Sequence, residues 1–249
     1  MKKEKTWNSI KWKEVQLRVW RIQTQIYNYS LKGDKLQVTH LQKILINLLE
    51  TKLLAVRKVT QDNRGKKTAG IDGVKLLTPV QRIRLVYKIK IDGRCDPIKQ
   101  CLVPKSSKLD KYRSLGIPTI RDRAKQALAL LALEPEWEAK FEKNSYGFRP
   151  GRCTHDAIEA IHSSINKSPK YVLDGDIRKC FDQINHTALL AKMDTFPKMR
   201  QQVQAWLKAK IVMQNDETIF PNEGTPQGGI LSPLLANIAL NGIEKHLSD

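Results

Sequence analysis

The sequence predicts an α+β fold for a chain of 249 residues, which is long enough for one or two domains with a sizeable buried core. Apolar residues recur at helical spacings of three and four over residues 7–58, 120–141 and 234–247. Short apolar runs between turn residues predict strands at 99–104, 113–118, 171–177 and 211–220. Because helices and strands alternate without a regular βαβ period, the α+β class fits better than α/β.

The N-terminal residues 7–58 predict two amphipathic helices. In the first, apolar residues spaced three or four apart, from Trp12 to Tyr29, form one stripe. Asp34 is placed to cap the second helix, with Gln37 three residues later. Two helices cannot bury both of their apolar stripes alone, so we expect a hairpin that packs on the elements that follow.

Residues 61–73, QDNRGKKTAGIDG, predict a loop, because they hold glycines and basic residues and little that is apolar. We place a domain boundary within this loop. Residues 1–69 then form a basic helical extension, and residues 70–249 form a second domain.

A hairpin and a long helix come next. Strands 99–104 and 113–118 flank a polar, basic tip. Thr119 is placed to cap the following helix, with Asp122 as its capping partner. Pro135 is expected to end or bend that helix.

In the C-terminal part, residues 171–177 predict a strand, and a β-hairpin is expected to turn at Asn215 and Asp216. Ser232 and Pro233 stand where an N-cap and a first helical residue belong. One helix is expected to follow them.

The charge balance points to nucleic acid. The chain has 44 Lys and Arg against 25 Asp and Glu, a net charge of +19. Residues 1–69 alone hold 16 basic and 5 acidic residues, a net of +11. A helical hairpin with a basic outer face is suited to the backbone of RNA. The alternative, an ordinary solvated helix face on an over-basic soluble protein, stays open at this point.

The composition argues against several other classes. No apolar run approaches the roughly 18 residues of a membrane helix, and the N-terminus lacks the apolar core of a secretory signal. We therefore expect no membrane partner. The four cysteines form no C-x-x-C pair and the five histidines are scattered, which argues against structural zinc and favours reduced thiols.

Two segments carry residues suited to chemistry on nucleic acid. In YVLDGDIRKCFDQINH, alternation along a strand puts Asp174 and Asp176 on one face, where two carboxylates need solvent or a cation such as Mg²⁺. A simple role in capping a helix is the alternative for either Asp. In GTPQGGILSPLLAN, Gly and Pro residues fix a tight turn before a helix, and Gln227 offers both a donor and an acceptor.

The chain resembles the reverse transcriptase and maturase proteins encoded by group II introns. The resemblance runs from about Trp7 to the C-terminus. It is carried by the leader from Trp7 to Asp34 and by the segments LLAVRKVTQDNRGKKTAGIDG, SLGIPTIRDRAKQAL, NSYGFRPGRCTHDA, YVLDGDIRKCFDQINH and GTPQGGILSPLLANIAL.

The resemblance implies a right-hand polymerase, with fingers and a partial palm in residues 70–249 and an RNA-binding extension in residues 1–69. It implies RNA-templated DNA synthesis with two Mg²⁺ ions, and help for the intron RNA in folding and splicing. By position, Asp176 matches the first metal-binding catalytic aspartate of the palm. The matching nucleotide-site residues are Lys105, Arg113, Phe181, Gln227 and Gly228. The expected RNA contacts are Arg18, Arg21, Lys35, Arg57, Lys58, Arg64, Lys66, Lys67 and Arg149.

The sequence also departs from the family pattern. Ser114 stands where a proline is usual after Arg113, Gly175 stands where a larger residue is common, and Lys105 and Arg113 are slightly further apart than usual. The largest departure is that no aromatic-x-Asp-Asp motif occurs in the 249 residues. We therefore expect an N-terminal portion that does not polymerise alone and that binds Mg²⁺ only if another chain completes the palm.

Three hypotheses follow from this departure. A second polypeptide could supply the Asp-Asp hairpin and the thumb, the chain could be a non-catalytic RNA-binding splicing factor, or it could be a decayed gene product. The bacterial cytoplasm and the plastid stroma both fit the sequence.

Overall fold

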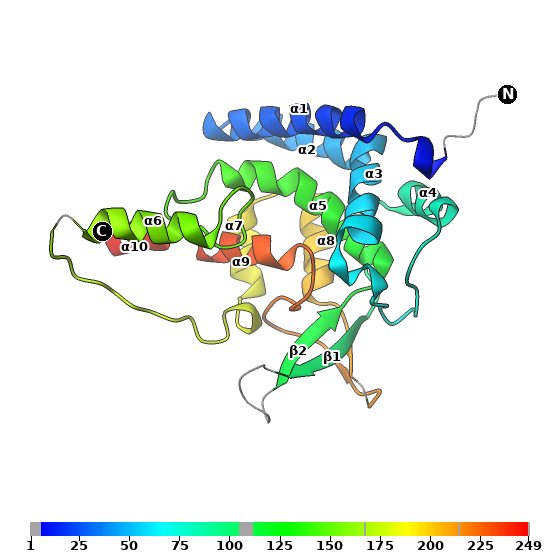
Figure 1. The fold of residues 1–249 in the computed structure, drawn as a ribbon. Helices are drawn as coiled ribbons and strands as arrows, with labels where there is room; N and C mark the ends of the chain where they lie inside the picture. The colour runs from blue at the N-terminus through cyan, green and yellow to red at the C-terminus, as the bar shows by residue number, and fades with distance from the viewer. Residues whose placement is uncertain (1–5, 105–111, 167, 214, 249) are drawn as a thin grey trace.

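The computed structural model describes residues 6–104, 112–166, 168–213 and 215–248. A helical layer and a small sheet meet at one central helix, α5, which runs through the middle of the molecule (Figure 1). The helices of the layer, of which α1, α2 and α3 contact α5, are α1 (Trp12–Leu31), α2 (Lys35–Asn47), α3 (Leu49–Arg57) and α4 (Pro79–Lys88). The later helices are α5 (Ile120–Glu138), α6 (Thr154–Ile165), α7 (His186–Met193), α8 (Pro197–Leu207), α9 (Ser232–Leu240) and α10 (Ile243–Ser248). The short helical turns are Trp7–Ser9, Lys58–Asp62, Arg64–Lys67 and Cys180–Asp182.

The N-terminal hairpin of α1 and α2 is confirmed, but the predicted second helix is two helices. Leu48 adopts an extended conformation, with ψ at 134°, and separates α2 from α3. The break turns α3 so that Leu53, Ala55 and Val56 are buried in the core. The N-cap is as predicted, because the Asp34 carboxylate accepts a hydrogen bond from the backbone N–H of Gln37 at 3.1 Å.

Helix α5 is buried along most of its length, which a single amphipathic stripe did not predict. Thr119 caps it as expected, accepting from the backbone N–H of Asp122 at 3.2 Å. The helix passes through Pro135 and ends at Glu138. Because proline has no N–H, the carbonyl of Leu131 loses its helical donor. The side chain of Gln23 on α1 replaces it, donating to that carbonyl at 2.8 Å.

The sheet has the order β2-β1-β3-β4. Its strands are β1 (Ile98–Pro104), β2 (Tyr112–Ile117), β3 (Ile211–Val212) and β4 (Thr218–Ile219). The predicted pair β1 and β2 is antiparallel, and β3 joins β1 in parallel. The predicted hairpin between β3 and β4 turns at Asn215 and Asp216. The tip at residues 105–111 lies outside the described residues.

Three other sequence predictions were wrong. Residues 171–177 form no strand and are exposed throughout, because no described segment takes their backbone hydrogen bonds and a strand needs a paired neighbour. The C-terminal helix is interrupted at Gly242, whose φ of +97° no helical residue adopts, so that α9 and α10 are separate. Ser232 begins α9 instead of capping it, and its hydroxyl donates to the carbonyl of Pro226 at 2.8 Å.

A buried polar cluster joins α5 to α8 and to the segment before β1. The Lys125 ammonium donates to Asp92 at 2.7 Å, and the indole N–H of Trp206 donates to Asp122 at 3.2 Å. Burial raises the pKa of the Asp122 carboxyl. Among the described residues, no helix is long and apolar enough to cross a membrane.

Candidate functional site

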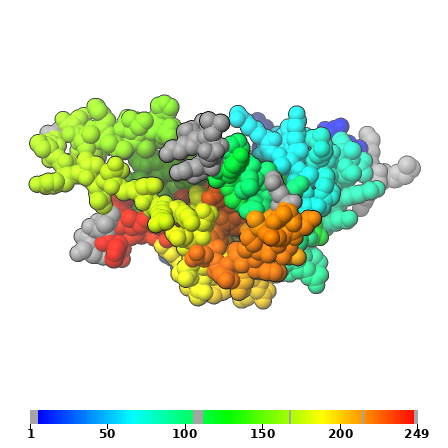
Figure 2. Space-filling view, turned by 90° about the horizontal axis from the view of Figure 1, so that it is seen from below, coloured from blue at the N-terminus to red at the C-terminus, as the bar shows by residue number. Residues whose placement is uncertain are grey.

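The glycine-rich turn at residues 224–229 lies between strand β2 and the segment that begins at Phe181. The backbone N–H of Gly116 on β2 donates to the carbonyl of Gln227 at 2.6 Å. On the other side, the N–H of Thr225 donates to the carbonyl of Phe181 at 2.7 Å. The turn thus holds two distant parts of the chain side by side, as the view from below shows for the orange, green and yellow segments (Figure 2).

Two of the glycines are required by close backbone contacts. Gly224 has φ of +82°, and a Cβ there would lie 2.6 Å from the carbonyl oxygen of Asp182. Gly228 has φ of +114°, and a Cβ would lie 2.5 Å from the carbonyl oxygen of Gly116. Since real Cβ atoms do not approach backbone oxygens so closely, packing within the protein itself explains the glycines at these two positions.

The same turn is fixed to the helices behind it. The amide oxygen of Gln126 on α5 accepts from the backbone N–H of Ile230 at 2.8 Å. The imidazole Nε2 of His186, at the start of α7, lies 2.7 Å from the carbonyl oxygen of Gly224. These contacts make the turn a rigid edge rather than a free loop.

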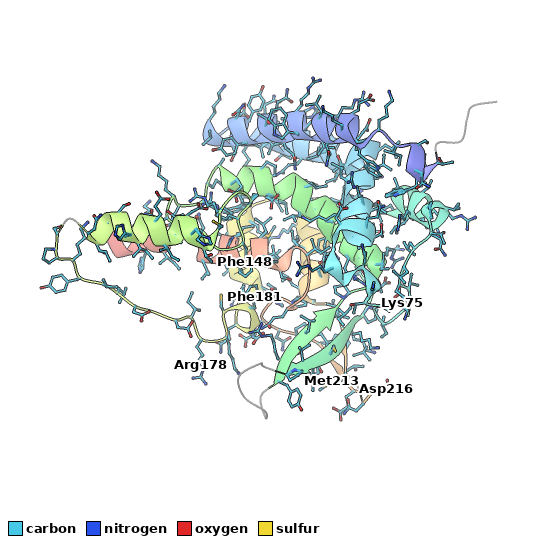
Figure 3. All side chains as sticks on the ribbon, viewed as in Figure 1. Lys75, Phe148, Arg178, Phe181, Met213 and Asp216 are labelled. Carbon is cyan, nitrogen blue, oxygen red and sulfur yellow. The ribbon has the colours of Figure 1, made fainter. Side chains whose placement is uncertain are left out.

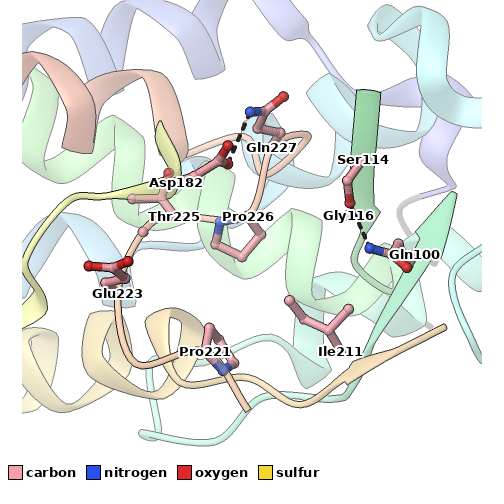
Figure 4. A pocket seen from close by; sticks show the side chains of 11 residues that line it. Gln100, Ser114, Gly116, Asp182, Ile211, Pro221, Glu223, Thr225, Pro226 and Gln227 are labelled. Carbon is pink, nitrogen blue, oxygen red and sulfur yellow. Dashed lines mark hydrogen bonds between the residues drawn. The ribbon is translucent and has the colours of Figure 1, made fainter. Parts of the chain in front are cut away.

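A pocket of about 150 Å³ opens at this edge (Figure 4). Its lining residues are Gln100, Ser114, Gly116, Asp182, Ile211, Pro221, Glu223, Gly224, Thr225, Pro226 and Gln227. The Gln227 amide donates to the Asp182 carboxylate at 3.1 Å. The hydroxyl of Ser114, where the family usually has proline, accepts from Gln100 on the neighbouring strand at 2.8 Å. Of the predicted residues, the pocket therefore contains Gln227. Gly228 follows Gln227 in the sequence, and Phe181 precedes the lining residue Asp182.

Phe181 contacts a second aromatic residue that sequence reasoning missed. The rings of Phe148 and Phe181 meet edge to face, with centroids 6.1 Å apart, and the two side chains lie one above the other in Figure 3. Phe148 has φ of +58° and is 70% exposed. Its place in the GFRPG motif, next to the predicted Arg149, is the signal that could have identified it.

Asp176 and Asp174 are exposed, on the segment that was expected to be a strand. The neighbouring Arg178 points away from the molecule (Figure 3). The described residues contain no group of three or more His, Cys, Asp and Glu that could hold a metal ion. Binding of Mg²⁺ at Asp176 therefore stays a prediction.

Arg149, predicted to contact RNA, is a buried residue that closes its own loop. Its guanidinium pairs with Glu138 at the end of α5, with the shortest N–O distance at 2.8 Å. It also donates to the carbonyls of Glu142 and Ser145, both at 2.9 Å, and stacks over Phe141. These contacts occupy most of its donors, so an RNA contact at Arg149 would have to compete with them.

The predicted basic residues of the extension divide into paired and unpaired ones. Arg18 pairs with Glu50, Lys35 pairs with Asp194, and the side chain of Lys66 donates to the carbonyl of Gln61 at 2.6 Å. Arg57 lies 3.5 Å from Asp62 and stacks over Trp12. The exposed residues without an ion pair to any described residue are Arg21, Lys58, Arg64 and Lys67.

Arg113 and Lys105 are the other two residues predicted to belong to the nucleotide site. Arg113 is exposed on β2. Lys105 lies outside the described residues.

A buried arginine, Arg123, fixes the basic loop to the start of α5. Its guanidinium donates to the carbonyls of Gly65 at 3.0 Å, Thr68 at 2.5 Å and Pro118 at 3.1 Å. Gly70 lies so close to the backbone of Thr119 that a Cβ would be 2.8 Å away. Arg64 and Lys67 are thereby held beside the sheet end of α5.

Comparison with known proteins identifies the class of protein. The family described as reverse transcriptase (RNA-dependent DNA polymerase) matches residues 103–249, and the N-terminal domain of reverse transcriptase matches residues 7–89. The chain therefore belongs to the reverse transcriptase family.

Its relatives include group II intron-encoded and maturase-like proteins, which confirms the resemblance drawn from the motifs. Protein YkfC of Escherichia coli K12 is 33% identical over 84% of this chain and 58% of its own length. Group II intron-encoded protein LtrA of Lactococcus lactis is 32% identical over 89% of this chain and 35% of its own. Maturase-like protein 1 of Euglena gracilis is 29% identical over 94% and 51%. The chain thus spans between about a third and three fifths of the length of these relatives.

A solved structure supports the fold. One chain of the partial Cas6-RT-Cas1–Cas2 complex matches with a TM-score of 0.50 and 22% identity, over 84% of this chain and 35% of that chain. The α+β class and the expected fingers and palm architecture are confirmed at the level of the fold.

Proposed function

We propose that this chain is the RNA-binding extension, fingers and partial palm of a group II intron reverse transcriptase and maturase, and that it binds intron RNA to assist splicing or retrohoming. The observation that carries the proposal is the rigid glycine-rich edge at 224–229. It gathers Gln227 and the Phe181 segment around one pocket beside β2. Intron-encoded and maturase-like relatives support the same assignment. Either the bacterial cytoplasm or the plastid stroma is the proposed compartment.

The proposal includes completion of the palm by a second polypeptide. Residues 171–177 are exposed, although their pattern is that of a strand. On α6 the side chains of Ile158, Ile161 and Ile165 share one face and are all exposed. An added β-hairpin would pair with 171–177, and its apolar residues would pack against α6. If that hairpin carried two aspartates, its carboxylates and Asp176 would together suit Mg²⁺.

The test of RNA binding is a titration of intron RNA at several salt concentrations. We expect log Kd to change linearly with log salt, because Lys and Arg release counterions from the phosphates. The test variant is a quadruple one, in which Arg21, Lys58, Arg64 and Lys67 become Gln, since none of these forms an ion pair with a described residue. Its salt slope should be smaller than that of the unchanged chain. An unchanged salt slope in this variant would contradict the proposed surface.

Catalysis is tested by primer extension on an RNA template with Mg²⁺. We expect no DNA synthesis by the 249-residue chain alone, because the described residues contain no three-carboxylate metal set. Addition of a polypeptide with an aromatic-x-Asp-Asp hairpin should restore synthesis, and Asp176→Asn should abolish it. Synthesis by the isolated chain would refute this part of the proposal.

A non-catalytic splicing factor is the second candidate, and the exposed, unclustered position of Asp176 favours it. In that case Asp176→Ala leaves both RNA affinity and splicing assistance unchanged. Since the carboxylate is exposed, the substitution has little effect on stability. A loss of splicing assistance would instead point to a metal-dependent role.

A further inference from the structure

Helix α1 carries a second apolar stripe on the face that points away from the protein. Its first stripe, which includes Val15, Val19 and Ile26, is buried against the core. The second stripe lies on nearly the opposite side, with its large side chains three, seven and four residues apart and 38–60% exposed. These side chains are Leu17, Trp20, Tyr27 and Leu31. In Figure 1, α1 forms the outer edge of the helical layer, and no element covers this side.

The two aromatic residues frame a shallow hollow of about 220 Å³. Gln23 and Thr24 form the rest of its lining. Both polar side chains are already bonded within the protein, Gln23 to the carbonyl of Leu131 at 2.8 Å and Thr24 to the carbonyl of Trp20 at 3.0 Å. The hollow therefore offers a ligand mainly aromatic surface.

The surroundings of the hollow are basic. Between Glu14 and Glu50, the only acidic residue is Asp34. Arg21, next to Trp20, is exposed and makes no ion pair with a described residue. A second copy of the chain would bring an equally basic face against this one, and the two faces would repel each other. A single-stranded nucleic acid has both phosphates for the arginine and bases for the rings.

We propose that the outer face of α1 binds a single-stranded segment of RNA, with unpaired bases stacked on Trp20 and Tyr27 and a phosphate paired with Arg21. This inference rests on the proposed function, in which the chain binds RNA, and adds the kind of RNA that its extension recognises. A base-paired duplex keeps its bases stacked inside, so its affinity does not depend on the two rings.

The test compares a fluorescent single-stranded RNA with a blunt duplex of the same length. Trp20→Ala and Tyr27→Ala should each weaken single-strand binding by about tenfold, within the roughly 5- to 150-fold range expected for loss of one stacking contact. Trp20→Phe should keep most of the affinity. Duplex binding should change little, and Leu36→Ala, at an 84% exposed apolar residue outside the hollow, is the matched control.

Salt dependence separates stacking from charge. Trp20→Ala should leave the slope of log affinity against log salt unchanged, whereas Arg21→Gln should reduce it by about 0.7 for a single strand. Because Trp20 and Arg21 are exposed, thermal unfolding of both variants should match that of the unchanged chain.

Three results would overturn the inference. Equal single-strand affinity for Trp20→Ala and Leu36→Ala would show that no base stacks on Trp20, even if the chain binds RNA. Equal losses on duplex and single strand would also contradict it. A dimer in sedimentation that Trp20→Ala dissociates would assign the face to a second copy of the chain. If the unchanged chain binds neither RNA, the proposed function itself fails.

Discussion

Replacing Gly228 with alanine tests whether the glycine-rich turn is fixed by close packing against β2. The added Cβ would lie 2.5 Å from the carbonyl oxygen of Gly116 and 3.0 Å from Cδ1 of Leu115. A leucine side chain can move, but the carbonyl belongs to a paired strand. The turn must therefore shift away from β2, which breaks the 2.6 Å hydrogen bond from Gly116 to Gln227.

Two contributions determine the expected loss of stability. A non-glycine residue in a sparsely populated region of positive φ costs about 1–3 kcal/mol. Loss of the backbone hydrogen bond costs about 1 kcal/mol more. Gly228→Ala should therefore lower the free energy of unfolding by about 2–4 kcal/mol, a large part of the roughly 5–15 kcal/mol that holds a domain folded.

Two other glycines serve as matched controls. Gly73 also has a positive φ, +68°, but no atom lies within 4 Å of its ideal Cβ, so Gly73→Ala should cost only about 1–2 kcal/mol of strain. Gly147 has neither a positive φ nor a neighbour within 4 Å, so Gly147→Ala should be within about 0.5 kcal/mol of neutral. Urea unfolding followed by circular dichroism measures all three. A Gly228→Ala protein no less stable than Gly73→Ala would refute the role of close packing.

Other substitutions test the buried charges. Arg149→Ala should destabilise the protein by about 3–5 kcal/mol in urea unfolding, because it leaves Glu138 without its partner. Arg123→Ala should speed proteolysis and amide exchange within residues 63–70, whose carbonyls lose their donors. Burial raises the pKa of the Glu134 carboxyl above its ordinary 4.5, so the folded chain binds this proton more tightly than the unfolded chain. Stability is therefore lost as pH rises above 4.5, and Glu134→Gln should remove that loss in thermal unfolding followed across pH.

Local signals in the sequence predicted the elements whose partners are close in the chain. The caps at Asp34 and Thr119 depend on residues within three positions, and both are confirmed. The β1 and β2 hairpin and the turn at Asn215 were equally readable, because turn residues fix the pairing of adjacent strands. The helix break at Leu48 carried no glycine or proline signal. Its extended backbone lets α3 pack on α5, and this tertiary contact is not visible in the local sequence.

The site was predictable in residue identity more than in residue role. Gln227 lines the pocket, and Gly228 follows it and packs against the carbonyl of Gly116. The fate of Arg149 depended on Glu138, eleven residues earlier on another element, and no spacing rule connects them. Pro135 shows the same limit. It leaves the carbonyl of Leu131 without a helical donor, and the donor that replaces it, Gln23, lies more than a hundred residues away in the sequence. Such contacts form only once the fold exists.

The failed strand at 171–177 and the unburied helix α6 have one physical explanation. Both follow the patterns of buried elements, alternation in the first and an Ile158, Ile161, Ile165 face in the second. Around α5, by contrast, the same kinds of pattern produce buried residues, so the patterns themselves are sound. These two segments have the apolar patterns of buried elements but are exposed, so we expect residues other than those described to cover them. Since one hairpin could pair with 171–177 and cover α6 at the same time, a single added element would bury both.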